Sequence, residues 1–208
     1  MIKKVCGLFT AVCVSMSATV AMAQDLSELD GDTTAEYAQH LTEQFNKIED
    51  HQVKVEVDPE KAVGLSDEME GIIVVPAKDL KEGEPNEAVH TEQGAGLAYL
   101  FCSPRFDPII DGKKIDAKKL RTFKYMDDSG IEKTATCMIL AVRNVEGDDW
   151  RLYAYGAEKK PVIDAKFADA AEAPEGNLTI AVKDAKGKKQ MLVVTLFGKY
   201  AAEFAIGH

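Results

Sequence analysis

Residues 144–156, NVEGDDWRLYAYG, contain the only tryptophan of the chain together with an arginine and two tyrosines. Side chains alternate between the two faces of a β-strand, so Trp150 points away from the face that carries Arg151, Tyr153 and Tyr155. We expect Trp150 in the core, which leaves the other three side chains as an aromatic and polar row on the outer face of a sheet. This row predicts a ligand-binding surface of the kind that holds carbohydrate. The alternative is that Tyr153 and Tyr155 only stabilise neighbouring strands through cross-strand contacts.

Two cysteines, Cys102 and Cys137, lie in the part of the chain that follows residue 23. Residues 1–23 have the pattern of a signal peptide, described below, and an even number of cysteines in an exported protein is typical of disulfide bonding. A bond between these two cysteines would stabilise the fold by roughly 4 kcal/mol in the chain-entropy model. We therefore predict a Cys102–Cys137 disulfide. Two buried free thiols are the alternative, because both cysteines lie in apolar, strand-like runs.

The sequence motifs of common catalytic and cofactor sites are absent: there is no P-loop, no G-x-G-x-x-G, no H-E-x-x-H and no G-x-S-x-G. We predict no catalytic residue, no cofactor and no metal site. The aspartate pairs at 127–128 and 148–149 fit turns, which favour aspartate and glycine. A hydrolase that draws its carboxylates from the loops at 78–93 and 103–111 remains an alternative.

The N-terminal residues 1–23 have the pattern of a signal peptide. Lys3 and Lys4 precede an apolar stretch at 5–20, and the sequence AMA at 21–23 supplies the small residues that signal peptidase requires. The apolar stretch is too short for a stable transmembrane helix, and no later stretch is long enough. We therefore predict cleavage before Gln24 and export to the periplasm, cell surface or medium, with no transmembrane segment in the mature chain.

The charge of the chain argues against two classes of partner. Its net charge at pH 7 is −10, and removal of the predicted signal peptide with Lys3 and Lys4 leaves −12. Nucleic acids and anionic membranes would repel such a protein. A carbohydrate, or a protein contacted through a helix or an edge strand, is the expected partner.

One amphipathic helix is expected at residues 33–51. Thr33 and Glu36 form a capping-box pattern at its start, and the apolar side chains that follow recur at helical spacing; they are Ala38, Leu41, Phe45 and Ile48. This stripe predicts a helix that docks on the body of the domain, with pairing to another helix as the alternative.

The rest of the chain predicts about ten short strands, because alternating or wholly apolar runs are separated by turn residues. They are expected at 53–57, 71–76, 96–102, 108–110, 120–126, 131–143, 150–155, 162–167, 178–182, 190–197 and 200–206. The predicted fold is all-β, an antiparallel β-sandwich with a β-barrel as the alternative. After the signal peptide, residues 24–51 form an acidic leader and the helix, and residues 52–208 form the β-sandwich domain.

These features together favour a non-enzymatic binding or structural module that acts after export. The secreted hydrolase is one alternative. The other is a subunit of an envelope assembly that docks through the apolar stripe of the N-terminal helix.

Overall fold

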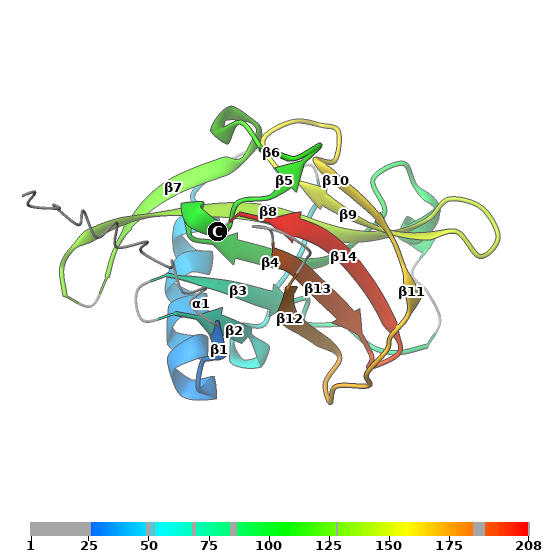
Figure 1. The fold of residues 1–208 in the computed structure, drawn as a ribbon, viewed down its shortest axis with the longest axis horizontal. Helices are drawn as coiled ribbons and strands as arrows, with labels where there is room; N and C mark the ends of the chain where they lie inside the picture. Colours follow the sequence, from blue (N-terminus) through cyan, green and yellow to red (C-terminus); the bar gives the residue numbers. More distant parts are fainter. Residues whose placement is uncertain are drawn as a thin grey trace, which may run out of the picture.

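The computed structural model describes residues 26–48, 51, 53–67, 70–83, 87–127, 129–184 and 190–207. The predicted signal peptide and its cleavage site before Gln24 lie outside the described residues. Within them the chain forms one α-helix and fourteen strands, all paired antiparallel (Figure 1). No sheet formed by these residues closes into a barrel. The all-β class with one N-terminal helix is therefore confirmed, and the barrel alternative is wrong.

The larger sheet has eight strands, with β8 (Glu132–Asn144) at its centre. One edge of β8 pairs with β4; the other pairs first with β7 and then with β9. The other strands of this sheet are β1 (Ser27–Glu28), β2 (Val63–Ser66), β3 (Gly71–Pro76), β4 (Ala95–Cys102), β7 (Arg121–Met126), β9 (Trp150–Tyr155) and β10 (Ile163–Lys166). The apolar run on both faces of β8 fits its central place, because both faces of this strand are covered.

The smaller sheet has four strands in the order β11 (Ala168–Asp169), β14 (Tyr200–Ile206), β13 (Gln190–Leu196) and β12 (Leu178–Asp184). A separate hairpin joins β5 (Ile109–Ile110) to β6 (Lys113–Lys114). Four short 3-10 turns connect the strands: η1 (Pro59–Lys61), η2 (Glu87–His90), η3 (Pro104–Phe106) and η4 (Ala117–Lys119).

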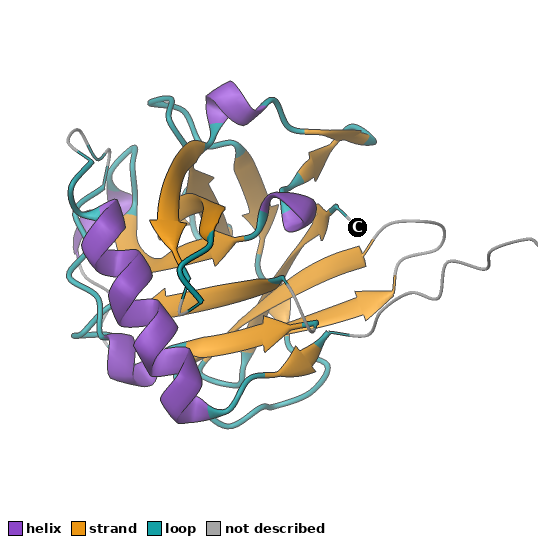
Figure 2. Cartoon of the chain, turned by 90° about the vertical axis from the view of Figure 1, so that its left-hand side faces the viewer, coloured by secondary structure: helices purple, strands orange, loops and turns teal. Residues whose placement is uncertain are grey.

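Helix α1 (Gly31–Phe45) docks on the larger sheet, as predicted (Figure 2). It begins earlier than the sequence suggested, because the carboxylate of Asp30 and not the hydroxyl of Thr33 caps it; Asp30 accepts a hydrogen bond from the amide of Thr33 at 3.0 Å. Ala38, Leu41 and Phe45 are buried, so the apolar stripe is not free to bind a partner. No helix of the described residues is long and apolar enough to cross a membrane.

The larger sheet separates two hydrophobic cores. Its inner face, defined here as the face toward the smaller sheet, carries Ile72, Val74, Leu100, Met138, Leu140, Leu152 and Ala154 against Leu178, Ile180, Leu192, Val194, Leu196, Ala202, Phe204 and Ile206. Its outer face packs under α1 and carries Ile73, Val75, Tyr99, Phe101, Cys137, Ile139, Tyr153 and Tyr155. Strand alternation therefore buries both faces of the same sheet.

The strands of the structure differ from the predicted ones in two ways. Residues 53–57 alternate in sequence, yet only Val57 forms a bridge, with Ala77, while Val53 and Val57 are buried in the outer core. Strand β2, in contrast, lies outside the predicted strands, as do the two-residue strands β1, β6 and β11. Its sequence VGLS is too short and too weakly patterned to stand out, and pairing with β3 makes it a strand.

The predicted Cys102–Cys137 disulfide is not present, because the two cysteines are free and point to opposite faces of the larger sheet. Cys102 lies opposite Thr136, and Cys137 lies opposite Phe101, so the two are diagonal neighbours whose side chains face different cores. Burial raises the pKa of both thiols, which makes them unreactive in the folded protein. The alternative of two buried free thiols is the one that the structure shows.

Candidate functional site

The predicted aromatic row on β9 exists, but it is covered. Leu152 and Ala154 face the inner core, and Tyr153 and Tyr155 face the outer core, as the alternation predicted. However, Tyr153 and Tyr155 are only 6% and 1% exposed, so they cannot form a surface platform. The prediction that Tyr153 and Tyr155 form an exposed row with Arg151 is therefore wrong.

The segment before β4 and the adjacent strand β8 contact the two tyrosines. The hydroxyl of Tyr155 donates to the carbonyl oxygen of Gln93 at 3.0 Å, and burial raises the pKa of Tyr155 to about 12. The guanidinium of Arg143 lies over the ring of Tyr153, 5.7 Å from its centroid, and donates to the Tyr153 hydroxyl at 3.1 Å. Both tyrosines thus anchor the outer core.

Arg151 is held by its neighbours. Its Nε and one terminal nitrogen donate to the two carboxylate oxygens of Asp149 at 2.8 and 3.0 Å, and the other terminal nitrogen lies 3.3 Å from Asp164. Hydrogen bonds from Arg151 hold the pKa of the Asp149 carboxyl below its usual range. Asp149 is therefore paired, whereas Asp148 forms no ion pair with another described residue.

The structure instead places a pocket of about 860 Å³ between the two sheets, here called the inter-sheet pocket. On the larger sheet it is bordered by the first residues of β4, the last part of β8 and the first residue of β9; on the smaller sheet, by β11, the end of β13 and the start of β14. The loop after β3 and turn η2 complete it. The other end of the inner core is closed by Phe106, which is 1% exposed.

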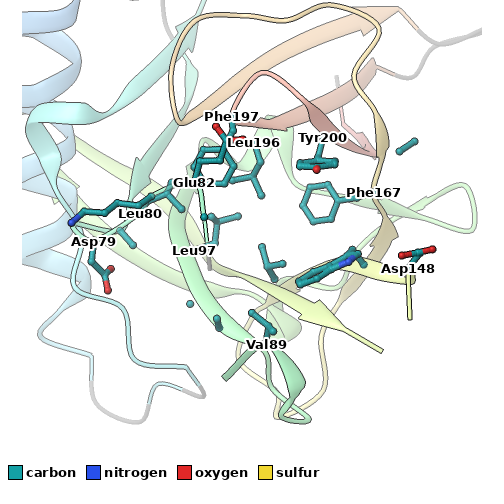
Figure 3. Close-up of a pocket in the computed structure, with 18 of the residues that line it drawn as sticks. Asp79, Leu80, Glu82, Val89, Leu97, Asp148, Phe167, Leu196, Phe197 and Tyr200 are labelled. Carbon is teal, nitrogen blue, oxygen red and sulfur yellow. The ribbon is translucent and has the colours of Figure 1, made fainter. Parts of the chain in front are cut away.

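Aromatic and aliphatic side chains line the pocket. Figure 3 shows Phe167 and Tyr200 at one side, with Leu80, Leu196 and Phe197 toward the other. Trp150 also borders the cavity; it is partly exposed and belongs to neither core, so the expectation that it anchors the core is wrong. Tyr200 is 47% exposed, and Leu97 and Val89 are buried in the pocket wall.

The turn between β13 and β14 holds Phe197 in a strained conformation. Its φ of 53° lies in the left-handed region, which a phenylalanine rarely adopts, and Gly198 follows with φ 63°. The turn is tied at both ends, because the Phe197 amide donates to Asn177 at 2.9 Å and the Lys199 amide donates to Leu196 at 2.9 Å. Such strain persists only where surrounding structure enforces it, and it recurs at binding sites. Here it places an aromatic ring in the wall of the pocket.

Acidic side chains surround the apolar wall. Asp79, Glu82, Asp148 and Asp169 border the cavity, with Lys81 as its one cationic lining residue among the described positions. Lys199 forms an ion pair with Glu82, and this contact raises the pKa of Lys199. In the described part of the chain, no ion pair involves Asp79, Asp148 or Asp169.

Acidic residues from the two loops named for a hydrolase lie at different ends of the inner core. Asp79 and Glu82, from the loop after β3, lie at the inter-sheet pocket, whereas Asp107 lies at the closed end and accepts a hydrogen bond from Thr136 at 2.7 Å. Burial raises the pKa of Asp107, with the Thr136 hydrogen bond and Lys114 acting in the opposite direction. Among the described residues, no group of three histidine, cysteine or acidic side chains is close enough to hold a metal ion.

Sequence patterns do not reveal the pocket, because its lining comes from segments between residues 77 and 200. The only local signal is the isolated tryptophan at the start of β9. Comparison with known proteins adds no function: no protein-family model, no curated protein and no solved structure matches this chain.

Proposed function

We propose that this protein is an exported, non-enzymatic β-sandwich module that binds a small organic ligand with an apolar body in the inter-sheet pocket. The pocket itself carries the proposal. Its volume of about 860 Å³ falls within the range of roughly 300–1,000 Å³ typical of small-molecule sites. A partly open, aromatic-lined cavity of this size at the end of two packed sheets offers a ligand the concave apolar surface that small-molecule sites share.

The lining indicates which part of the ligand enters. Leu97, Val89 and Leu196 are buried in the wall, while Trp150 and Phe167 keep part of their surface exposed toward the cavity. Covering that surface with an apolar group would remove it from water at a gain of about 25 cal/mol per Å². The carbohydrate expected on β9 has less support, because the tyrosines meant to stack on it are buried.

Fluorescence titration with Nile red, a neutral dye that brightens in apolar surroundings, tests the proposal. We expect one dye per protein and energy transfer from Trp150, the only tryptophan. Replacing Phe167 by alanine should weaken dye binding at least about fivefold, since a ring of this size contributes about 1 kcal/mol or more to an apolar contact.

Met126→Ala is the matched control. Met126 is 52% exposed at the end of β7 and does not border the pocket. Equal loss of dye binding in the two variants would mean that the dye reports general surface apolarity, and absence of binding to the wild type would contradict the proposed function.

Export is the second part of the proposal, and the pattern of residues 1–23 supports it. Expression of the full chain in a bacterium, followed by intact-mass measurement of the periplasmic or secreted fraction, should give a polypeptide that begins at Gln24. Retention of residues 1–23 would contradict this part alone.

A further inference from the structure

The inter-sheet pocket combines two features that recognise different parts of one molecule. Aromatic rings from Trp150, Phe167, Phe197 and Tyr200 supply flat, electron-rich faces, and carboxylates lie around them. From this combination we propose that the ligand is an amphipathic organic cation, with an ammonium group among the carboxylates and an apolar body in the cavity. This inference rests on the proposed function and names the class of its ligand.

The charge balance at the pocket favours a cation. Four carboxylates border the cavity against one lysine, Lys81. Internal pairing removes only part of this excess, because Lys199 neutralises Glu82 while Asp79, Asp148 and Asp169 have no ion-pair partner among the described residues. In Figure 3, Asp79 and Asp148 lie at opposite margins of the pocket. An anionic ligand would meet repulsion from both margins.

The neighbouring Asp149 differs from Asp148 in its ion pairs. Asp149 and Asp148 are adjacent in sequence, but Arg151 and Lys166 neutralise Asp149 outside the pocket. The same turn thus pairs one carboxylate and leaves the other unpaired at the cavity. A ligand cation would supply the missing partner for Asp148.

Aromatic rings add a second attraction for the same charge. A cation over the face of a tryptophan, tyrosine or phenylalanine gains roughly 0.5–2 kcal/mol from the ring quadrupole. Trp150 directly follows the turn that carries Asp148, so the indole and the carboxylate border the same part of the cavity. The cavity volume of about 860 Å³ far exceeds that of an ammonium group alone, so a ligand that fills the cavity needs an apolar body beside its ammonium group.

Three probes that share an eight-carbon chain separate head-group charge from apolar affinity: octyltrimethylammonium, octyl β-glucoside and octanoate. Each is titrated into the mature protein at low salt, with Trp150 fluorescence and calorimetry as readouts. We expect the cation to bind at least about fivefold more tightly than the glucoside and at least about tenfold more tightly than octanoate. Raising the salt concentration should reduce this preference, because it screens exposed carboxylates.

The double substitution Asp148→Asn with Asp169→Asn tests the carboxylates directly. It should weaken octyltrimethylammonium binding at least about fivefold and leave octyl β-glucoside binding unchanged. The matched control is Glu60→Gln with Glu158→Gln, which changes the net charge equally at two exposed sites away from the pocket. The control should shift cation binding less than twofold.

The outcomes distinguish this inference from the proposed function. Equal or tighter binding of octanoate or the glucoside would overturn the cation inference while the pocket remains a binding site. The same holds if Nile red binds and none of the three probes does, or if the control substitutions weaken cation binding as much as the pocket pair. Failure of Nile red and all three probes would overturn both.

Discussion

The two faces of the larger sheet are made by the same strands and are covered in different ways. On the outer face, α1 covers the sheet, and the rings of Phe45, Tyr99, Phe101 and Phe123 interlock with centroids 4.9–6.1 Å apart. Beside α1, the segment at 53–56 borders a second cavity of about 520 Å³. On the inner face a second sheet packs against the first, and at one end it leaves the inter-sheet pocket.

The two faces pack against different kinds of element, a helix on the outer face and a sheet on the inner face, and this accounts for the difference in packing. A single helix with its neighbouring loops can adjust to a twisted surface, whereas two twisted sheets meet well only over part of their area. Under α1 the outer face is therefore filled by the protein's own side chains, and the inner face retains the inter-sheet pocket at its open end. Comparable side chains should thus contribute stability on one face and binding on the other.

The largest expected effect comes from truncating one phenylalanine on each face. Phe45 is 0% exposed, so Phe45→Ala should destabilise the protein by about 3–5 kcal/mol, because a cavity remains under α1. Phe167 is only partly buried, so Phe167→Ala should cost roughly 1 kcal/mol. Urea denaturation of both variants measures the difference. Similar losses would mean that the pocket wall is packed like the outer core.

The positions of most strands were predictable from the sequence, but which segments pack on each face of the larger sheet was not. The alternation in 150–155 and 200–206 gives the bounds of β9 and β14 as the structure has them, since period-two patterns are local. Whether Tyr155 is exposed depends on Gln93, which is 62 positions away in the chain. For the same reason, local pattern could not show that Trp150 borders a cavity with Phe167, Phe197 and Tyr200.

The second prediction concerns Gly96, where the segment at 53–55 on the outer face approaches the backbone of β4. A Cβ at this position would lie 2.4 Å from Cγ2 of Val55 and 3.0 Å from the carbonyl oxygen of Lys54. Gly96→Ala should therefore destabilise the protein by about 1–3 kcal/mol through overpacking.

Gly31→Ala is the matched control for this substitution. A Cβ at Gly31 meets no atom within 4 Å, and alanine favours the first turn of α1, so this variant should be neutral or more stable by less than about 1 kcal/mol. Thermal unfolding compares the two. A neutral Gly96→Ala would show that residues 53–55 do not hold tightly to the outer face.

The third prediction compares the closed and open ends of the inner face. Asp107 is 4% exposed at the closed end, and burial raises the pKa of its carboxyl above the usual value of about 4. A raised pKa means that folding favours the protonated form. The stability that this form contributes is present below the unfolded pKa and is lost as pH rises through the folded pKa.

Asp107→Asn removes this titration while keeping an oxygen that can accept the hydrogen bond from Thr136. Relative to the wild type, the variant should therefore gain stability as the pH rises from about 4 toward neutrality. Urea denaturation at several pH values measures this difference, with the exposed Glu158→Gln as the control. A difference between Asp107→Asn and the wild type that does not change with pH would mean that the closed end admits water freely.

The smallest expected effect is that of a reducing agent, which should leave the denaturation midpoint of the mature protein unchanged. The assignment of the two faces requires this result, because Cys102 points to the inner core and Cys137 to the outer core, and sulfur atoms on opposite sides of one sheet cannot bond. A disulfide would instead contribute roughly 4 kcal/mol in the chain-entropy model, which reduction would remove. Thiol titration in denaturant without reductant should likewise find both cysteines reactive, while the folded protein reacts slowly because burial raises the pKa of both thiols.

A lower midpoint after reduction, or no reactive thiol in denaturant, would place both side chains on the same face. It would thereby contradict the register of β4 against β8, on which the comparison of the two faces depends.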